Sequence, residues 1–464
     1  MDQAVSMNDA ARPAQYDPRY DPLIATRVAC DQDYPPTWWA ASAGTPPPDD
    51  GPITKDTDVD VAIIGAGFTG LATAIFLARE HGIRATVLEA NRPGWGCSGR
   101  NGGQGQNASG RLSRRQWVER WGLDTALKMH AEIGAGFELF KDLIRDIECD
   151  QQPGGHLLIA HRPKIMKHLA AEQRYNKKVF NYDTELIDTA TLRTRFVNDA
   201  EAAGGLHEPI GISVHPLKLL FGYLKLAREL GATVHPASPV IGWEVRNGVH
   251  HLTTPGGTVR ARAVGVATGG YTTQHLHPQL TNRIMPVLSN NAVTRPLTQK
   301  EIEACNFVTR IALTDTRTLR FYYRLLPDNR LQMGSRSAIT GADADHPRHL
   351  QLLIDGLHRK FPPLAGLEFE YSWWGWVDIS HDMMPRIVQP DPAQSFYYAL
   401  GYGGNGVSYS VRAGQHMAEW IAGKGQQLDL PIFTSPLPGH PFAPFRRLGQ
   451  RMLYHWYYLR DEVI

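Results

Sequence analysis

The segment that constrains the fold most lies near the start of the chain. A β-branched and apolar run, Asp58–Ile64, is followed at once by the pattern Gly-x-Gly-x-x-Gly over Gly65–Gly70. Leu71–His81 then has the character of a helix, and Ile83–Leu88 has that of a second strand, which ends at Glu89. A βαβ unit of about 30 residues, with an acidic residue about 20 positions beyond its glycines, predicts a dinucleotide-binding site.

Each residue type in this unit has a physical role. Gly65 permits a tight turn, Gly67 lets the backbone approach a pyrophosphate, and Gly70 lets the helix pack closely on the strand. The helix N-terminus offers unpaired N–H groups and a partial positive charge to the phosphate. Glu89 would accept hydrogen bonds from ribose hydroxyls and would repel a 2′-phosphate, which argues against NADP. A membrane span over the uncharged run Val61–Ala78 is the less favoured alternative.

Three later segments bear on whether the dinucleotide carries a nicotinamide or a flavin. A glycine-rich loop, Ala90–Gln104, follows the second strand directly and can run beneath a pyrophosphate and a flavin. The predicted strand Val259–Val266 closes with small residues up to Gly270. The predicted strand Phe396–Leu400 leads through Gly401–Gly406 into a helix, whose start is a second anion site.

In these residues, in this order and at this spacing, the chain resembles the glycine/D-amino-acid-oxidase (DAO) superfamily of FAD-dependent oxidoreductases. Within it, the chain is most similar to γ-glutamylputrescine oxidase-like amine oxidases. The resemblance covers about residues 34–421 and also includes the stretch Trp374–Pro385. It implies an α/β fold, with a Rossmann-like FAD-binding domain of discontinuous segments and an antiparallel-sheet substrate domain.

The resemblance also implies which residues hold FAD. The glycines and Glu89 would bind the ADP half, and Val240 would meet the adenine. The loop from Ser98 would line the pyrophosphate and flavin, and Gly404–Val407 would bring a helix start to the flavin's pyrimidine edge. The implied residues are Gly65, Gly67, Phe68, Thr69, Gly70, Glu89, Ala90, Ser98, Gly99, Arg100, Asn101, Gly102, Val240, Thr268, Gly269, Gly404, Asn405, Gly406 and Val407.

The chain of 464 residues divides into segments that alternate between the two expected domains. The expected organisation is an extended N-terminal leader (1–56), an FAD-binding domain (57–150, 215–275 and 376–430), a substrate domain (151–214 and 276–375) and a C-terminal tail with a helix (431–464). Within these, Lys128–Cys149 and His215–Leu230 are predicted helices, and Leu319–Arg324 with Leu331–Ser335 is a predicted hairpin.

Composition limits the partners. A formal net charge of +2 gives no field that argues for nucleic acid. Four scattered cysteines form neither a disulfide framework nor a zinc pattern, so no metal is expected and a cytoplasmic location fits.

The segment Phe445–Arg460 mixes arginines with large apolar residues. It is interpreted as a tail helix packed on the body, with peripheral membrane contact as the less favoured alternative. The oligomeric state stays open.

Four positions depart from sarcosine oxidases within the resemblance. No cysteine precedes Asp382–Pro385, so FAD is expected to be non-covalent, with Cys97 as the residue that could attach it instead. Gln332 stands where those enzymes place a lysine that promotes reaction with O2. Ser408 and the stretch Gly103–Gly105 stand where they hold the substrate carboxylate. The departures favour a longer amine, without a carboxylate next to the reacting carbon.

The expected reaction is hydride transfer to the flavin from the C–H beside an amine nitrogen, giving an imine and then an aldehyde. O2 is the expected acceptor; the alternative is an amino- or imino-acid dehydrogenase that passes electrons to a quinone or carrier. The amine must bind deprotonated, and an apolar aromatic wall would favour that form. The candidates for the wall are Phe321, Tyr322, Tyr323, Trp374 and Trp376, with Gln332 beside them. No catalytic side chain is assigned, because the cofactor supplies the chemistry.

Overall fold

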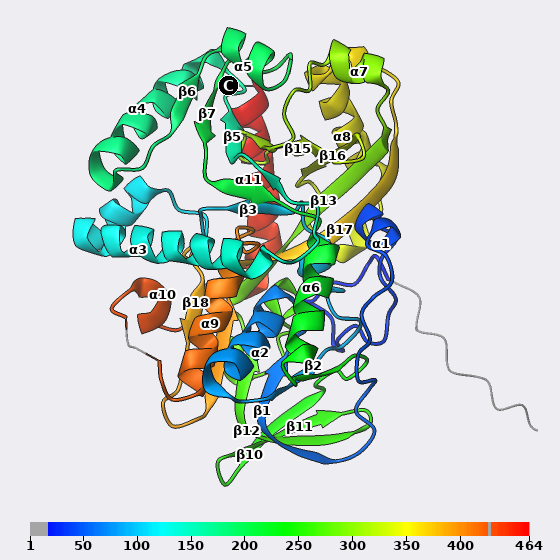
Figure 1. The fold of residues 1–464 in the computed structure, drawn as a ribbon, viewed down its shortest axis with the longest axis vertical. Coiled ribbons are helices and arrows are strands. Elements are labelled where there is room, and N and C mark those ends of the chain that lie inside the picture. Colours follow the sequence, from blue (N-terminus) through cyan, green and yellow to red (C-terminus); the bar gives the residue numbers. More distant parts are fainter. Residues whose placement is uncertain (1–16, 426–427, 464) are drawn as a thin grey trace, which may run out of the picture.

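The computed structural model describes residues 17–425 and 428–463. Two large sheets form the two halves of the molecule. Figure 1 shows the sheet that contains the predicted βαβ unit below, and the second sheet above. The first sixteen residues of the predicted leader lie outside the described residues.

The helices are α1 (Trp38–Ser42), α2 (Phe68–His81), α3 (Arg114–Ile144), α4 (Pro163–Phe180), α5 (Thr189–Arg195), α6 (Pro216–Glu229), α7 (Gln299–Ala304), α8 (Pro347–Lys360), α9 (Tyr409–Ile421), α10 (Pro431–Thr434) and α11 (Arg446–Tyr458). The strands are β1 (Thr57–Ile64), β2 (Ala85–Leu88), β3 (Gln104–Gln106), β4 (Gln152–Pro153), β5 (His156–Ile159), β6 (Glu185–Ile187), β7 (Gly205–Glu208), β8 (Gly211–Ser213), β9 (Thr233–His235), β10 (Gly242–Arg246), β11 (Val249–Thr254), β12 (Gly257–Val266), β13 (Ile284–Pro296), β14 (Ala312–Asp315), β15 (Tyr322–Leu325), β16 (Arg330–Ser335), β17 (Phe369–Ser380), β18 (Arg386–Val388) and β19 (Phe396–Leu400).

The first sheet is built around β1. This strand lies between β12 and β2, parallel to both, and the order continues through β9 on one side and the β10–β11 hairpin on the other. β19 adds a further parallel partner for the end of β12. The last four residues of β1 are buried because helices cover the sheet, with α2 packed against α6 and α9. The carboxyl ends of β1, β2 and β12 therefore meet at one edge, where α2 begins.

The predicted βαβ unit is confirmed, since β1, α2 and β2 follow one another within three residues of their expected limits. The helix expected from Lys128 begins instead at Arg114. Ser113 and Gln116 form a capping box there, and the helix continues through a kink at Gly122, whose φ is 79°. The spacing of a serine and a glutamine three residues apart is a helix-start signal that the sequence prediction passed over.

The second sheet has the order β17-β13-β16-β15-β14-β5-β7-β6. Neighbouring strands in this sheet are antiparallel, except β14 and β5, which are parallel. The sheet is therefore antiparallel, as expected, apart from that one pair. β13 and β17 pair along most of their length, from Ile284 opposite Ser380 to Thr294 opposite Phe369. β17 thereby carries residues of the second sheet down to the edge of the first.

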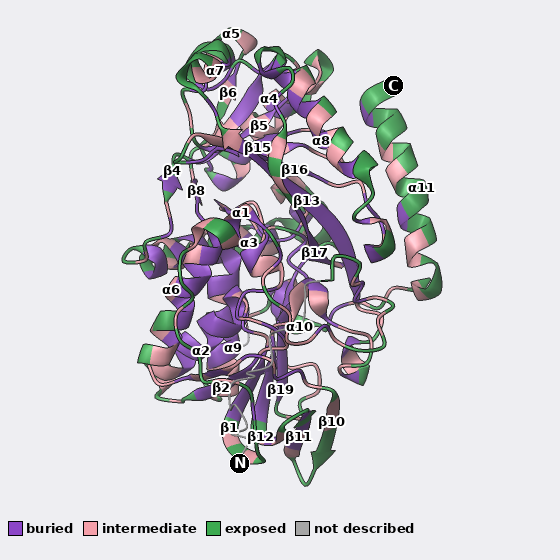
Figure 2. Cartoon of the chain, turned by 90° about the vertical axis from the view of Figure 1, so that its right-hand side faces the viewer, coloured by how far each residue is buried: buried purple, intermediate pink, exposed green. Residues whose placement is uncertain are grey.

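The two ends of the described chain both pack against the body. Trp39 of α1 is 1% exposed, and its indole N–H donates to the Asn101 carbonyl at 2.9 Å. Arg447 of α11 makes two hydrogen bonds to the buried Asp21 at 2.8 and 2.9 Å. Figure 2 shows α11 standing along one side of the molecule with much of its surface exposed. Among the described residues, none of the helices is both long and apolar enough to cross a membrane.

Candidate active site

A large cavity opens where the first sheet meets β17. It contains about 1310 Å³ of space that no atom fills, part of it open to solvent. Its walls come from segments far apart in the sequence. The predicted FAD-binding residues that line it are Gly65, Gly67, Phe68, Thr69, Glu89, Ala90, Ser98, Asn101, Val240, Thr268, Gly269, Gly404, Gly406 and Val407.

The remaining predicted residues lie behind the cavity or beside it. Gly70 and Gly99 are backbone-packing positions: an added Cβ would lie 1.9 Å from the Gly65 carbonyl oxygen and 2.3 Å from the Gly94 carbonyl oxygen, respectively. Arg100, Gly102 and Asn405 line a second cavity that adjoins the first. The prediction therefore names residues that the fold brings into one region.

The turn between β1 and α2 requires its glycines. Gly65 has φ of 106°, and a Cβ there would lie 2.8 Å from the Ala267 carbonyl oxygen. Gly67 is the N-cap of α2 and has no side chain to bond the first N–H groups. Ser98 supplies that acceptor from the neighbouring loop, because its Oγ accepts from Phe68 N at 3.0 Å. The first turn of α2 contains no acidic residue.

Glu89 is held at the end of β2 by two backbone donors. Its Oε2 accepts from Ala66 N at 2.9 Å, and its Oε1 accepts from Asn91 N at 3.0 Å. Burial raises the pKa of the Glu89 carboxyl, and these backbone hydrogen bonds oppose that rise. The side chain is therefore fixed in position beside the glycine turn, with lone pairs left for hydroxyl donors.

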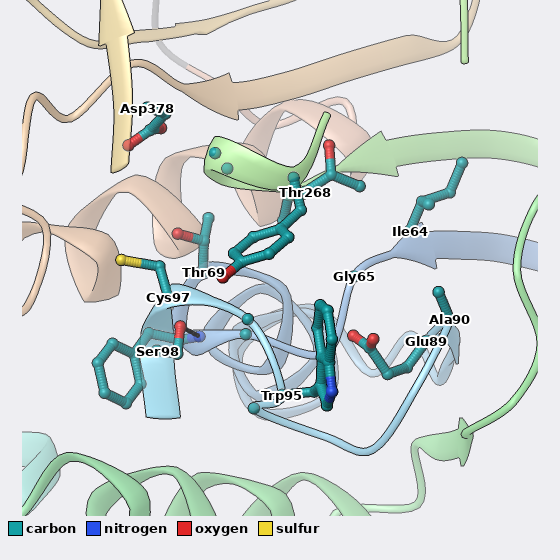
Figure 3. Close-up of a pocket in the computed structure, with 18 of the residues that line it drawn as sticks. Ile64, Gly65, Thr69, Glu89, Ala90, Trp95, Cys97, Ser98, Thr268 and Asp378 are labelled. Atoms are coloured by element: carbon teal, nitrogen blue, oxygen red, sulfur yellow. Dashed lines mark hydrogen bonds between the residues drawn. The ribbon is translucent and has the colours of Figure 1, made fainter. Parts of the chain in front are cut away.

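The opposite end of the cavity has a different character. Figure 3 shows Glu89 and Ala90 at one end, and Cys97 and Asp378 at the other. Asp378 of β17 accepts from Gly401 N at 2.6 Å, which ties β17 to the glycine loop that leads into α9. Burial raises the pKa of Asp378 to about 6. Burial also raises the pKa of the Cys97 thiol to about 12, so the thiol is protonated at neutral pH.

The leader contributes to this cavity, which the sequence did not predict. Tyr20, Val28 and Ala29 all line it, and Trp95 of the loop after β2 lies beside them. The leader carries no motif, and only its packing against the loop after β2 brings it here.

A second cavity adjoins the first and lies beneath the second sheet, with about 820 Å³ of space that no atom fills, part of it open to solvent. Cys97, Asn101, Val377, Gly404 and Val407 line both, so the two cavities meet at these residues. The further walls of the second cavity are polar. They include Gln104, Gln106, Ser289, Asn291, Thr314 and Tyr322, and four arginines, Arg100, Arg111, Arg320 and Arg336. None of the described residues that line it is acidic.

The expected aromatic wall is not what lines the second cavity. Only Tyr322 of the predicted set faces it. Phe321 and Tyr323 belong to the core of the second sheet, and Trp374 and Trp376 belong to a separate apolar cluster. Alternation along β15 and β17 explains this division, because successive side chains on a strand point to opposite faces. Tyr322 and Gly375 line the cavity, and their neighbours in the sequence point away from it.

Of the positions that depart from sarcosine oxidases, Gln104 lines the second cavity, whereas Gln332 and Ser408 line neither cavity. Gln332 is fully buried, and its amide donates to Asn291 Oδ1 at 2.6 Å. An added Cβ at Gly102 would lie 3.4 Å from Gln332 Nε2, so the glutamine supports the loop from behind. Ser408 donates to the Gln106 carbonyl at 2.5 Å. Both side chains are therefore engaged within the protein.

The larger cavity fits a dinucleotide. The β1–α2 turn presents a helix start without a side chain on its N-cap, and Glu89 offers a fixed carboxylate along the same edge. Larger side chains in place of the glycines that line the cavity would fill part of its space. These residue types are suited to ADP at one end and to a flat ring system at the other.

Comparison with known proteins agrees with this geometry. The family model "FAD dependent oxidoreductase" (DAO) matches residues 60–420. Gamma-glutamylputrescine oxidoreductase of Escherichia coli is 31% identical over 442 residues, which cover 92% of this chain and 98% of that protein. The probable oxidoreductase OrdL of Haemophilus influenzae is 30% identical over 385 residues, 82% of this chain and 86% of that protein.

Among solved structures, glycine oxidase from Geobacillus kaustophilus superimposes with a TM-score of 0.68 at 19% identity. The match covers 83% of this chain and all of that one, and it shows a shared fold. With the family model spanning most of the sequence and the dinucleotide turn in place, the chain belongs to the DAO family of FAD-dependent oxidoreductases.

Proposed function

We propose that this protein oxidises a C–N bond of an amine whose reacting carbon lies at the junction of the two cavities. The observation that carries the proposal is the continuity of the cavities through Cys97, Asn101, Val377, Gly404 and Val407. A cofactor in the first cavity and a small molecule in the second would meet there.

FAD would lie along the first cavity. Gly65, Gly67 and the start of α2 would hold the pyrophosphate, and Glu89 would accept hydrogen bonds from the ribose. Val240 would meet the adenine, while Thr268 and Gly269 would close over the cofactor. Gly404 and Val407 would carry the start of α9 toward the flavin ring, which when bound supplies the hydride acceptor.

The second cavity favours an amine in its neutral form. An alkyl ammonium has a pKa near that of lysine, so deprotonation at neutral pH costs about 4 kcal/mol. Three nearby guanidinium groups, those of Arg111, Arg320 and Arg336, disfavour another cation by charge repulsion. The protein would thus lower the pKa of the substrate amine by electrostatics, in place of the aromatic wall expected from the sequence.

O2 is the acceptor we favour, and a γ-glutamylputrescine-like amine is the substrate suggested by the relative from Escherichia coli. That relative also supports a role in polyamine catabolism. The alternative is an amino- or imino-acid dehydrogenase with a quinone or carrier as acceptor. Gln332 favours it, because an uncharged amide, whose Nε2 donates to Asn291 Oδ1, stands where sarcosine oxidases have a lysine.

The test is anaerobic bleaching of the bound flavin against a panel of amines, followed by mixing with air. The panel contains γ-glutamylputrescine, free polyamines, N-methyl amines, pipecolate and D-amino acids. We expect at least one amine to bleach the flavin, and the reduced protein to recover its colour quickly in air. Bleaching with slow recovery would replace the oxidase with the dehydrogenase, and no bleaching by any C–N compound would overturn the proposal.

A further inference from the structure

A buried row of polar side chains runs behind the second cavity. In the small sheet β3-β8-β4, Gln104 lies opposite Ser213, which lies opposite Gln152, so all three side chains project from one face. In the second sheet, Arg324 of β15 lies opposite Gln332 of β16, so these two also share a face. Arg324 donates through Nη1 to Gln152 Oε1, so the two faces meet. These five residues are called the polar layer.

Several atoms of the polar layer have no protein partner. Within the described residues 17–425 and 428–463, the buried atoms without a hydrogen bond include Gln104 Nε2, Ser213 Oγ, Arg324 Nε and Gln332 Oε1. Ser213 and Arg324 are each 1% exposed, and Gln332 is fully buried. Ordered water commonly satisfies such groups inside proteins. The set mixes donors with acceptors, and water, which offers both, suits it better than an anion or a cation does.

The polar layer meets a cavity at each end. Gln104 lines the second cavity. Arg324 lines a third cavity, between α1 and α6, which contains about 450 Å³ of space that no atom fills, part of it open to solvent. The walls of this third cavity carry the charged side chains of Asp150, Lys218 and Asp328. A hydrophilic opening to solvent therefore lies at the other end of the polar layer from the candidate substrate site.

His215 lies in the wall of the third cavity and stays neutral there. Its Nδ1 accepts from Lys218 N at 3.1 Å, at the start of α6. Its Nε2 lies 3.1 Å from Ser42 Oγ, which donates its own proton to the Trp38 carbonyl at 2.6 Å. Burial lowers the pKa of His215 to about 3. The imidazole therefore takes up no further proton at neutral pH, and a proton that reaches this cavity passes to the solvent.

The proposed chemistry gives such a route a task. An alkyl amine is mostly an ammonium ion at neutral pH, and hydride transfer requires the neutral form. Among the described residues, those that line the second cavity include neither a carboxylate nor an imidazole, and Asp378 lines the first cavity only. Burial raises the pKa of Cys97 and of Tyr322 to about 12, so both keep their own protons. A proton given up by an amine there must leave the second cavity.

We propose that the polar layer is a water-filled passage, through which the proton of a bound substrate ammonium leaves for the third cavity. The ammonium gives one proton to a water of the passage, and the electron pair of that N–H bond stays on nitrogen as the lone pair of the neutral amine. The excess proton then moves from water to water and reaches the solvent. Ser213, on the middle strand, is the positioning residue, because its hydroxyl both donates and accepts. The inference rests on the proposed function and adds how the substrate becomes neutral.

The first measurement is a high-resolution crystal structure of the FAD-loaded wild type, which needs neither substrate nor variant. We expect ordered waters hydrogen-bonded to Ser213 Oγ and to Arg324 Nε, in a continuous file between the second and third cavities. A dry layer, in which these atoms pair with protein groups, would overturn the proposal. Isolated waters that do not join the two cavities would overturn it as well.

The second measurement follows proton release with a pH indicator in weak buffer, when the FAD-loaded protein is mixed anaerobically with the amine that best bleaches it. Ser213→Val removes the hydroxyl, and Ser213→Thr keeps it at nearly the same volume. We expect release at least about 10-fold slower in the valine variant, and within about 2-fold of the wild type in the threonine variant. The solvent deuterium isotope effect on flavin reduction should also rise in the valine variant alone. Thr254→Val, which removes a hydroxyl buried in the first sheet, should change neither quantity.

The two proposals fail in different ways. If amines reduce the flavin and release is equal in Ser213→Val and Ser213→Thr, the passage is wrong while amine oxidation stands. The same holds if Asp378→Asn slows release and Ser213→Val does not. If no amine reduces the flavin, amine oxidation is wrong and the proton role is wrong with it, while a continuous file of waters still supports the passage.

Discussion

At the scale of single residues, Gly70 is the position where a methyl group has no room. A Cβ there would lie 1.9 Å from the Gly65 carbonyl oxygen, so an alanine must displace the turn that is proposed to hold the pyrophosphate. We predict that Gly70→Ala lowers the FAD content of the purified protein severalfold and lowers its melting temperature. Gly134→Ala is the matched control, because nothing lies within 4 Å of that added Cβ and alanine favours a helix. Equal FAD content in the two variants would contradict this account of the turn.

Cys97 is the residue that could attach the cofactor covalently, because it lines both cavities. Burial raises the pKa of its thiol to about 12, and the thiolate is the reactive form. We therefore predict that acid precipitation releases all flavin into the supernatant, for the wild type and for Cys97→Ala alike. A yellow pellet from the wild type that the variant loses would show attachment at this residue.

At the scale of elements, α9 is joined to α3 by a buried charge network. His416 Nε2 lies 2.9 Å from Glu132 Oε1, and Arg412 Nε donates to the same oxygen at 3.0 Å. Burial alone would lower the pKa of His416, but its hydrogen bonds to Glu132 and Glu419 raise it above 6.5. The network holds the helix whose start faces the candidate flavin site.

The raised pKa of His416 gives a pH dependence with a definite sign. A histidine whose pKa is higher in the folded state stabilises the fold fully below pH 6.5, and this contribution is lost as pH rises through the folded pKa. We predict that His416→Gln lowers the free energy of unfolding by about 1.5–3 kcal/mol at pH 6, and by less at pH 9. Urea denaturation at both pH values measures the difference. A gap that widens toward pH 9 would contradict the prediction.

At the scale of the whole molecule, a buried ionic cluster links distant segments of the second half. Lys360 Nζ lies 3.3 Å from carboxylate oxygens of Asp199, Glu201 and Asp315, and the lysine is fully buried. Arg317 joins Asp315 to Glu462 near the C-terminus. Segments separated by more than a hundred residues are thereby held at one point, beside the loops that carry Arg320 and Arg336.

Removing the central cation of this cluster should be costly. We predict that Lys360→Met lowers the free energy of unfolding by about 3–5 kcal/mol, because it leaves buried carboxylates without their partner. Lys225→Met is the matched control, since Lys225 is 70% exposed in its pair with Glu229 and should change stability by about 0.5 kcal/mol or less. Chemical denaturation compares the two. Equal effects would show that the buried cluster contributes no more than a surface pair.

The sequence by itself determined the nucleotide half of this protein. Its signals are local: β1, the glycines of the turn and Glu89 lie within one short βαβ unit, where steric limits on the backbone leave few alternatives. The later glycine loops before α9 and after β12 were identified for the same reason. Hydrophobic periodicity and residue spacing predict these strands, turns and loops, because residues close together in the sequence decide their structure.

Only the tertiary structure decided what lines the second cavity. Arg111, Arg320 and Arg336 stand in three loops with no shared motif, and strand alternation sends Phe321 and Tyr323 into the core while Tyr322 faces the cavity. Tyr20 and Ala29 reach the first cavity only because the leader folds back over the loop after β2. Contacts between distant segments depend on how the sheets and loops pack together, and no local pattern in the chain records that packing.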